Sequence, residues 1–415
     1  MRSYQDLFRT PEFTPLFLSA AAQTVAQTVS GLALGTLVYR ATDSPLLSAV
    51  SMFGPSIAQV LGATLFLSGA DRLPPRRALA GIALAFAAGT AVLALPGLPV
   101  WAVFAVVLVQ GLVASLGGGV RWGLLNEILS SGDGDGDGGR SGAGGGGGGD
   151  GYLLGRSVFN MMSGIMQITG YATGGVLVAV LSPRFSLLLA AVLFAVAAAV
   201  VRLGLSRRPP RSAGRPSVSA TWRANAHLWS DRPRRLTYLG LWLPNGLVVG
   251  CESLYVSYAP SSAGTLFACA ALGMLAGDLT VGRLLPPPVR RRAATPLLLL
   301  LAGPYLLFVL HPPVPVAACL VALASAGFGA SLVQQERLMT LTPGELSGHA
   351  LGLHSAGMLT LQGVSASLAG SVAQVTSPAV AMTVMALAST GVTLSLAAAA
   401  RRTKATAPRP APQVP

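Results

Sequence analysis

Charged residues are scarce in this sequence. Asp, Glu, Lys and Arg make up only 10% of its 415 residues, whereas 52% of the residues are apolar. A soluble domain carries roughly 25% charged residues, so this chain lacks the polar surface that it would need to face water on all sides. The composition argues against a soluble protein and indicates a bundle of helices embedded in a lipid bilayer.

Motifs that would hold a metal, a nucleotide or a catalytic centre are also missing. The three cysteines, Cys251, Cys269 and Cys319, form no CxxC pair, so the sequence indicates neither a zinc site nor a disulfide framework. The phosphate-binding pattern GxxxxGK(S/T) is absent, which excludes a pump of the P-loop type for this chain. No Ser–His–acid, HExxH or paired-carboxylate arrangement has a convincing spacing. We therefore expect no enzyme, no metal and no cofactor.

The net charge of +14 does not indicate a nucleic-acid partner. Nucleic-acid binding requires a soluble basic face with aromatic or polar partners. Here the arginines lie in short stretches between long apolar runs, where membrane topology requires them. The lipid bilayer is therefore the expected partner of the bulk of the chain.

Twelve apolar runs are long enough to be membrane helices, which need about 20 mostly apolar residues. Their approximate bounds are 13–39, 46–68, 78–97, 99–125, 152–181, 184–204, 236–259, 262–282, 294–311, 313–335, 350–374 and 378–400. The first run is longer than the roughly 7–15 apolar residues of a signal-peptide core. We therefore interpret it as the first membrane span.

The connections between these runs alternate in charge. Basic residues gather after the second, sixth and eighth runs and in the tail, at Arg72, Arg76, Arg77, 202–235, 290–292 and 401–409. On the other side we find only Arg40 and Arg184. Cytoplasmic loops collect Lys and Arg, so the pattern predicts a multi-pass protein of the inner (plasma) membrane with both termini in the cytoplasm.

Two low-complexity connections divide the chain. Residues 130–151 read SSGDGDGDGGRSGAGGGGGGDG, which predicts a flexible insert. Its Asp–Gly alternation lacks the bidentate Glu of a calcium loop. The boundaries that we expect are a first half at 1–204, a basic linker at 205–235, a second half at 236–400 and a disordered tail at 401–415. We expect a monomer.

The two halves resemble each other in sequence. The segment after the second run reads GADRLPPRR (69–77), and the segment after the eighth reads GRLLPPPVRRR (282–292). The fifth run opens with GYLLG (151–155), and the eleventh opens with GHALG (348–352). Six spans separate the matching elements, so the halves share one orientation, as in the parallel repeats of major facilitator halves.

Two motifs carry a more specific resemblance. Residues 71–77 resemble the signature loop between the second and third helices of the major facilitator superfamily, although Pro74 and Leu67 stand where that family usually has Gly. Residues 170–175 (GYATGG) resemble the fifth-helix motif of its proton-antiporting drug exporters, with Tyr171 in place of the family's Pro. The same region also resembles siderophore exporters of the superfamily. The resemblance implies an all-α membrane protein with twelve transmembrane helices in two pseudo-symmetric six-helix halves.

The resemblance also assigns residues at the ends and packing faces of the helices. It implies a gate at the cytoplasmic loops, formed by Asp71, Arg72, Arg76, Arg77, Asp278 and Arg283. For Asp71 and Arg72 the alternative is a solvated topogenic loop, and for Asp278 it is a helix-end charge close to Arg283. Small residues at Gly170, Gly174, Gly175 and Gly370 are expected to let helices pack closely.

Few polar side chains fall inside the spans. Glu252 is the only acid well inside one, and an ionisable group in hydrocarbon is a functional candidate, so we expect it to bind and release a proton during transport. The alternative is a hydrogen-bonded carboxyl near the outer vestibule. The neutral candidates for a solute cavity are Gln23, Gln27, Gln110, Asn160, Gln167, Asn245 and Gln362. Each of these also suits a hydrogen bond between helices.

These features predict a secondary active transporter, and we expect proton-coupled efflux of small amphipathic compounds by alternating access. Arg121 lies 22 residues into the fourth span, about 33 Å at 1.5 Å per residue, so we expect it to extend to the inner surface near Glu127. With no basic residue expected near mid-membrane, the cavity is expected to favour hydrophobic or weakly cationic solutes. The alternatives are an importer or uniporter of a small solute and, further away, a membrane receptor or membrane enzyme.

Overall fold

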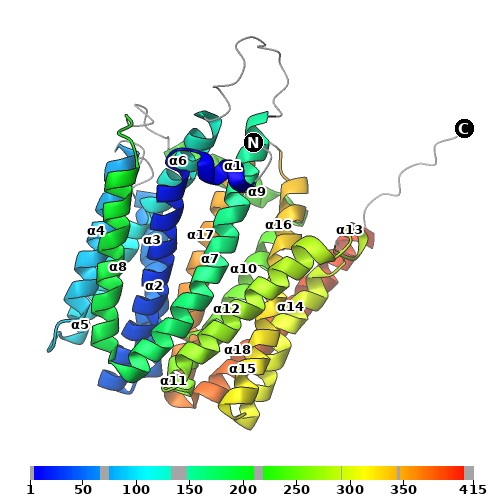
Figure 1. Ribbon diagram of the computed structural model, residues 1–415. Coiled ribbons are helices and arrows are strands. Elements are labelled where there is room, and N and C mark those ends of the chain that lie inside the picture. Colours follow the sequence, from blue (N-terminus) through cyan, green and yellow to red (C-terminus); the bar gives the residue numbers. More distant parts are fainter. Residues whose placement is uncertain are drawn as a thin grey trace, which may run out of the picture.

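The first half of the chain folds into eight helices. A computed structural model describes residues 4–65, 74–131, 147–209, 218–290, 292–343 and 346–405, and every regular element within them is helical (Figure 1). The helices of the first half are α1 (Tyr4–Arg9), α2 (Phe13–Thr42), α3 (Pro45–Leu65), α4 (Pro75–Leu93), α5 (Val100–Ala114), α6 (Gly117–Ser131), α7 (Gly147–Val180) and α8 (Pro183–Gly204). Because α5 and α6 follow one another with only Ser115 and Leu116 between them, together they form the fourth span.

The second half repeats this arrangement with more interruptions. Its elements are α9 (Val218–Ser230), α10 (Arg232–Glu252), α11 (Tyr255–Tyr258), α12 (Ala263–Leu279), the π-helical turn η2 (Thr280–Leu284), α13 (Pro287–Arg290), α14 (Ala294–Ala302), the 3-10 segment η3 (Gly303–Leu310), α15 (Val314–Ala326), the 3-10 turn η4 (Gly327–Gly329), α16 (Ala330–Thr340), α17 (Ser347–Val375) and α18 (Pro378–Ala405). Here α15, η4 and α16 form the fourth span of the half.

Helix starts follow simple capping chemistry. The Ser182 side chain accepts a hydrogen bond from the Phe185 backbone N–H at 3.1 Å, and Pro183 occupies the first turn of α8, where its missing N–H costs nothing. Asp231 caps α10 in the same way, accepting from the Arg234 backbone N–H at 3.1 Å. These two caps determine the residue at which α8 and α10 begin.

The twelve spans expected from hydropathy are all present. Each of the twelve apolar runs coincides with one helix or one consecutive set of helices. Within the described residues, seven helices are long and apolar enough to cross a membrane, and shorter apolar helices lie at Val100–Ala114 and Ala294–Leu310. The predicted fold class is confirmed: the protein is an all-α membrane protein with twelve transmembrane helices in two six-helix halves.

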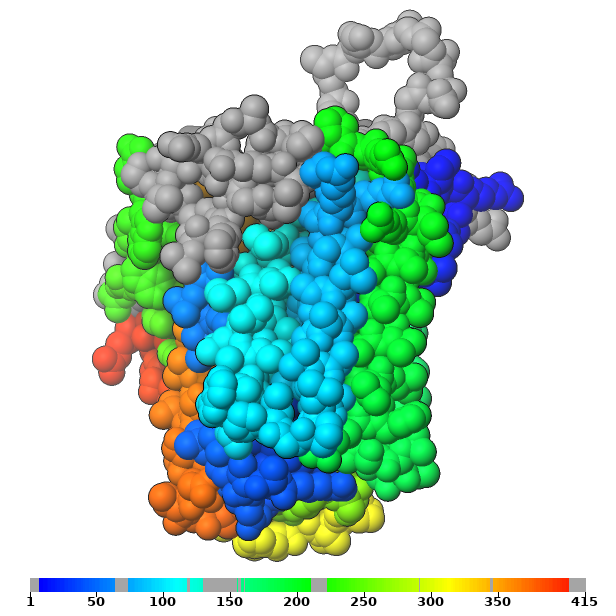
Figure 2. Space-filling view, turned by 90° about the vertical axis from the view of Figure 1, so that its left-hand side faces the viewer, coloured from blue at the N-terminus to red at the C-terminus, as the bar shows by residue number. Residues whose placement is uncertain are grey.

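The outer faces of the bundle are apolar. Figure 2 shows α4, α5 and α8 side by side on one face. Large apolar side chains lie exposed there, among them Leu84 on α4, Val109 on α5 and Val192 on α8. An apolar belt of this kind is costly in water and favourable against lipid, so the surface agrees with a membrane environment.

Three helices were not expected from the sequence, one of them the short α13 between the eighth and ninth runs. The region predicted as a linker, 205–235, contains α9, and α1 precedes the first span. In α9, Trp229 stacks on Trp242 of α10 with ring centroids 5.5 Å apart, while Trp222 is exposed. The linker is therefore attached to the second half by aromatic packing. Most of the expected insert, residues 132–146, lies outside the described residues, as does the end of the tail.

Candidate functional site

The two halves meet through helices packed backbone against backbone. α7 of the first half runs along α12 of the second, and α3 runs along α17. A Cβ added to Gly175 would lie 2.8 Å from the Cα of Gly264, and one added to Gly370 would lie 2.7 Å from the Cα of Leu46. No side chain fits in either place, so glycine is what allows these helices to touch.

A hydrogen bond joins the halves at the same end of the bundle. The Ser44 hydroxyl donates to the Gln374 side-chain oxygen at 2.7 Å. Ser44 precedes α3 and Gln374 lies in the last turn of α17, so this contact lies at the end opposite the start of α2. We call this the closed end.

Of the other expected packing glycines, Gly170 and Gly174 face Thr28 and Val29 of α2, inside the first half.

Glu252 is the last residue of α10 and lies near the closed end. Its side chain is buried, and its Oε1 has no hydrogen-bond partner. Three phenols, those of Tyr171, Tyr255 and Tyr305, lie close enough to interact electrostatically with it. The C-terminal end of a helix carries partial negative charge, so both burial and position favour the neutral acid. Taking up and releasing a proton is the chemistry open to such a group.

An aromatic chain links the two halves beside Glu252. Tyr171 of α7 stacks on Phe267 of α12, with ring centroids 4.8 Å apart and an interplanar angle of 16°. Phe267 in turn packs edge-on against Tyr255, whose hydroxyl is hydrogen-bonded to that of Tyr305. Tyr171 is the residue that replaces the Pro of the resembled motif. Tyr171 therefore makes an aromatic contact across the interface that proline, whose ring is saturated, could not make.

A cavity of about 240 Å³ lies inside the first half, lined by residues of α2, α4, α6 and α8 with one residue each from α3 and α5. Gln23 and Gln27, two of the expected cavity residues, line it together with Gln59 of α3 and Arg121 of α6. The Arg121 guanidinium donates a hydrogen bond to the Gln23 side-chain oxygen. The structure thus brings two predicted residues together with two that sequence reasoning did not assign to a cavity.

The sequence-based expectation for Arg121 was wrong. Instead of extending to the surface near Glu127, its guanidinium lies against Gln23 in the cavity, and Glu127 pairs with Arg208 at 3.3 Å. The length estimate assumed an unbroken helix, whereas the chain turns at Ser115 and Leu116. The presence of Gln and Arg on neighbouring spans was the sequence signal that could have predicted this cavity. The sequence alone, however, does not show which faces of these helices meet.

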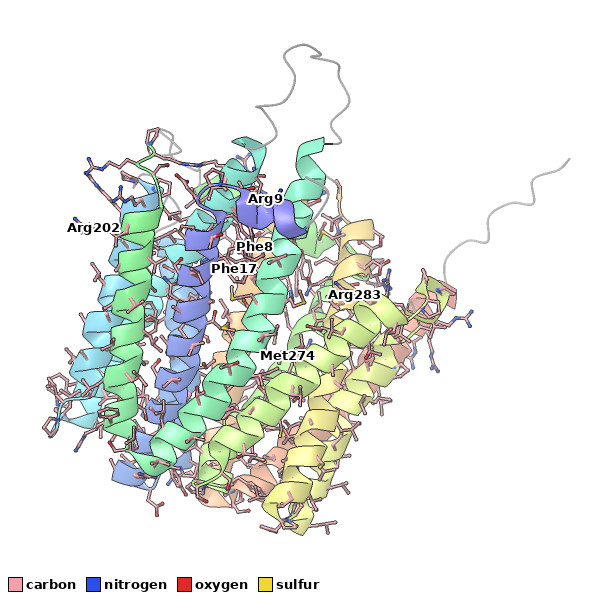
Figure 3. All side chains as sticks on the ribbon, viewed as in Figure 1. Phe8, Arg9, Phe17, Arg202, Met274 and Arg283 are labelled. Atoms are coloured by element: carbon pink, nitrogen blue, oxygen red, sulfur yellow. The ribbon has the colours of Figure 1, made fainter. Side chains whose placement is uncertain are left out.

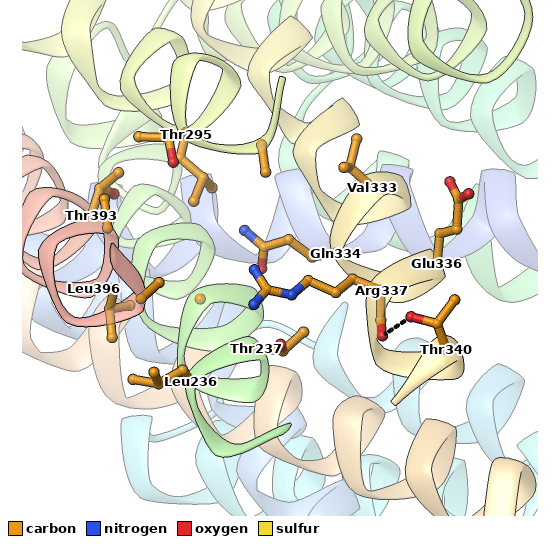
Figure 4. Close-up of a pocket in the computed structure, with 15 residues that line it drawn as sticks. Leu236, Thr237, Thr295, Val333, Gln334, Glu336, Arg337, Thr340, Thr393 and Leu396 are labelled. Carbon is orange, nitrogen blue, oxygen red and sulfur yellow. Dashed lines mark hydrogen bonds between the residues drawn. The ribbon is translucent and has the colours of Figure 1, made fainter. Parts of the chain in front are cut away.

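The second half contains a corresponding cavity of about 470 Å³, between α10, α14, α16 and α18 (Figure 4). These are the first, third, fourth and sixth spans of their half, as α2, α4, α6 and α8 are of theirs. In Figure 4 the Arg337 side chain extends toward Gln334, a buried amide whose Oε1 has no hydrogen-bond partner. Glu336 points away from this pair and forms a 3.1 Å ion pair with Arg290.

The other candidate amides lie apart from these cavities. Gln110 donates to the Phe86 carbonyl at 3.3 Å and to Thr90 at 3.1 Å, which joins α5 to α4. Asn245 is buried and donates to the Leu241 carbonyl at 2.6 Å. Gln167 and Gln362 are half-buried on α7 and α17, and the side chain of Asn160 lies outside the described residues.

Of the six charged residues expected at a gate, the structure describes four, and three of these are exposed on the surface of the bundle. Asp71 and Arg72 lie outside the described residues. Arg76 donates to the Arg202 carbonyl, and Arg77 is exposed. Asp278 and Arg283 are exposed as well, and no ion pair joins them among the described side chains. Figure 3 shows Arg202 and Arg9 on the first half and Arg283 on the second.

Each half contains an ion pair that the sequence did not reveal. In the first half these contacts lie near the start of α2. Arg208, which follows α8, contacts Glu12 at 2.9 Å and Glu127 of α6 at 3.3 Å. The Arg290–Glu336 pair has the same role in the second half. Among the described residues, no group of three metal-ligating side chains occurs.

No family model and no curated protein sequence matches this chain. Solved structures match it in fold. A POT family transporter in complex with a thioalcohol-conjugated peptide has a TM-score of 0.71 and 10% identity, over 94% of this chain and 96% of that one. The nucleoside transporter NupG has a TM-score of 0.71 and 14% identity, over 93% and 98%. The peptide transporter POT in complex with sulfate has a TM-score of 0.68 and 14% identity, over 97% and 99%.

These neighbours share one architecture across nearly their whole length. They are transporters of the major facilitator fold, and this chain has the same fold. At 10–14% identity the likeness concerns fold and not solute. The expected resemblance to drug and siderophore exporters is not reflected among these structures, which are named as peptide and nucleoside transporters.

Proposed function

We propose that this protein is a secondary transporter that moves a small solute across the membrane by alternating access. The observation that carries the proposal is the pair of six-helix halves, each braced by its own ion pairs and joined to the other at the closed end. Two such bodies can rock about a site between them, which is how parallel-repeat transporters work. The fold shared with solved transporters supports this function.

We propose further that transport is proton-coupled efflux of small amphipathic compounds. Glu252 supplies the proton-binding group, since it is a buried acid surrounded by phenols beside the interface of the halves. Apolar side chains, amides and Arg121 line the cavity of the first half, which suits a solute with one polar end. Both termini lie in the cytoplasm of a plasma-membrane protein, so the closed end faces outward.

Inverted membrane vesicles test this proposal. With the cytoplasmic face outward, an acidified lumen should drive uptake of a lipophilic test compound, and the compound should dissipate the proton gradient as it enters. Uptake that is unchanged after the gradient is collapsed with an uncoupler would contradict proton coupling. Absence of uptake of every compound tested, in vesicles that hold the folded protein, would contradict efflux.

Import is the second candidate, and a specific observation favours it. The structural neighbours are named as transporters of peptides and nucleosides and are crystallised with ligands such as 5-aminolevulinic acid. Right-side-out vesicles with an acidic exterior distinguish the two directions. Inward transport driven by the proton gradient would establish a symporter, and counterflow without proton movement would establish a uniporter.

A further inference from the structure

The cavity of the first half has an unusual charge balance. Arg121 is its one charged lining residue, and no carboxylate lines it. The hydrogen bond of Arg121 goes to the neutral oxygen of Gln23, and no ion pair joins this arginine to a described acid. A guanidinium held among apolar helices without a counter-charge is unfavourable, and a bound anion would offset that cost.

The polar groups around Arg121 match one carboxylate. A guanidinium has five N–H donors in a planar fork, and the bond to Gln23 uses one of them. The remaining donors can hold both oxygens of a carboxylate, which is the geometry that arginine favours. The amides of Gln27 and Gln59 line the same space and can donate to the same group. One positive charge balances one negative charge, so a monoanion fits better than a doubly charged phosphate.

The rest of the wall is apolar and partly aromatic. Phe86 of α4 and Phe194 of α8 pack with ring centroids 5.2 Å apart, and Ile82 and Trp122 complete this side. A cavity of about 240 Å³ holds a molecule the size of a substituted benzene ring. The cavity of the second half differs, because Glu336 joins Arg337 in its lining.

We propose that the cavity of the first half binds the carboxylate of a small monoanionic solute whose body is apolar or aromatic, with Arg121 as its ligand. This inference rests on the proposed transport function and names the solute class that the site would accept. It replaces the sequence-based expectation of a hydrophobic or weakly cationic solute, because that expectation assumed that no arginine lies in the cavity.

Binding of benzoate and benzamide to the purified full-length protein tests the inference. The two molecules have nearly the same shape and differ in charge, so calorimetry and thermal melting report the contribution of the carboxylate. We expect saturable binding of benzoate, at least tenfold tighter than benzamide. In Arg121→Gln, benzoate affinity should fall about 10- to 100-fold, as for loss of a hydrogen bond to a charged group. Arg184→Gln, the same change at an exposed residue of α8, should bind benzoate as the wild type does.

Further variants keep the test decisive if Arg121→Gln does not fold. Arg121→Lys keeps the charge but loses the planar fork, so its affinity should lie between those of the wild type and Arg121→Gln. Gln59→Leu keeps Arg121 and should weaken benzoate about 2- to 10-fold. Equal binding of benzoate and benzamide to the wild type, no binding of either, or an undiminished preference in the Arg121 variants would each overturn the inference.

The same measurements separate this inference from the proposed function. Benzoate binding that depends on Arg121, together with vesicles that transport nothing, would retain the site and contradict transport. Gradient-driven transport in a protein that shows no preference for the carboxylate would retain transport and remove the site.

Discussion

At the scale of single residues, two buried ionisable groups lie in opposite surroundings. Glu252 ends α10 among phenols and next to a helix C-terminus, where a negative charge is unfavourable. Arg121 lies among amides, where a negative ligand is favourable. One half therefore holds a carboxyl group that a proton can neutralise, and the other holds a guanidinium cation whose charge an anionic solute can balance.

The first prediction concerns Glu252. Replacing it with Gln keeps the shape of the side chain and removes its proton chemistry, so gradient-driven transport should fall at least tenfold while solute counterflow persists. Transport by the variant in inverted vesicles, with and without a pH gradient, measures this. Asp43→Asn is the matched control, because Asp43 is exposed and Asn tolerates its left-handed backbone (φ 50°). Gradient-driven transport that survives Glu252→Gln would remove this residue from the coupling mechanism.

A second prediction concerns Tyr171. Leucine at this position keeps an apolar side chain but loses the stacked contact with Phe267, so the closed end should lose about 0.5–1.5 kcal/mol of stabilisation. In a background without Cys251, Cys269 and Cys319, a thiol probe applied to a Ser44→Cys reporter should then react faster in Tyr171→Leu than in the reporter alone. The Tyr171→Phe variant retains the ring and should match the reporter alone. Equal rates for all three proteins would show that the stack does not hold this end closed.

At the scale of helices, the closed end depends on the absence of side chains. Gly175 and Gly264 bring α7 and α12 into backbone contact, and Gly370 does the same for α17 and α3. Helices in lipid associate through packing of this kind, since burial of apolar area gains little there. At these positions the backbones of neighbouring helices touch directly, with no side chain between them.

The third prediction follows from that surface. A Cβ at Gly175 would lie 2.8 Å from the Gly264 Cα, so Gly175→Ala must push α7 and α12 apart, at a cost of about 1–3 kcal/mol. The melting temperature of the purified protein should fall. Gly31→Ala on α2 is the control, because a Cβ there meets no atom within 4 Å and the change should leave the melting temperature the same or higher. Equal melting of the two variants would contradict close packing at this interface.

The helices themselves were predictable because a membrane span needs only a long apolar run, and each run is visible in the sequence. The rotation of a helix about its axis is not visible in that way. Gln23 and Gln110 looked alike as mid-membrane amides, yet one lines a cavity with Arg121 and the other joins α5 to α4. Ion pairs such as the one between Arg208 and Glu12 could not be predicted either, because nearly the whole first half of the sequence lies between the two residues.

At the scale of the whole molecule, the contacts within each half differ from the contacts between the halves. Arg208 and Arg290 tie helices together within a half, whereas the Ser44–Gln374 hydrogen bond joins one half to the other. Alternating access requires contacts of the second kind to break and those of the first kind to persist.

The fourth prediction uses this distinction. In a background without Cys251, Cys269 and Cys319, a cysteine pair at positions 44 and 374 should form a disulfide under oxidation, stop transport, and release it again on reduction. A pair at positions 290 and 336 lies within one half, and bridging it with a bifunctional thiol reagent that spans the Arg290–Glu336 contact should leave transport intact. Equal inhibition by both cross-links would contradict rocking of two bodies, and full transport with a locked 44–374 pair would show that the closed end never opens.

The interrupted fourth spans give each half a joint of its own. α5 passes into α6 through Ser115 and Leu116, and α15 passes into α16 through the 3-10 turn Gly327–Gly329. Irregular helical turns bend more readily than a continuous α-helix. The segments beyond these joints carry Arg121 in one half and Gln334 in the other. If these joints bend, α6 and α16 can shift relative to the rest of their halves, and we expect capture of a solute by α6 to precede the swing of the half that contains it.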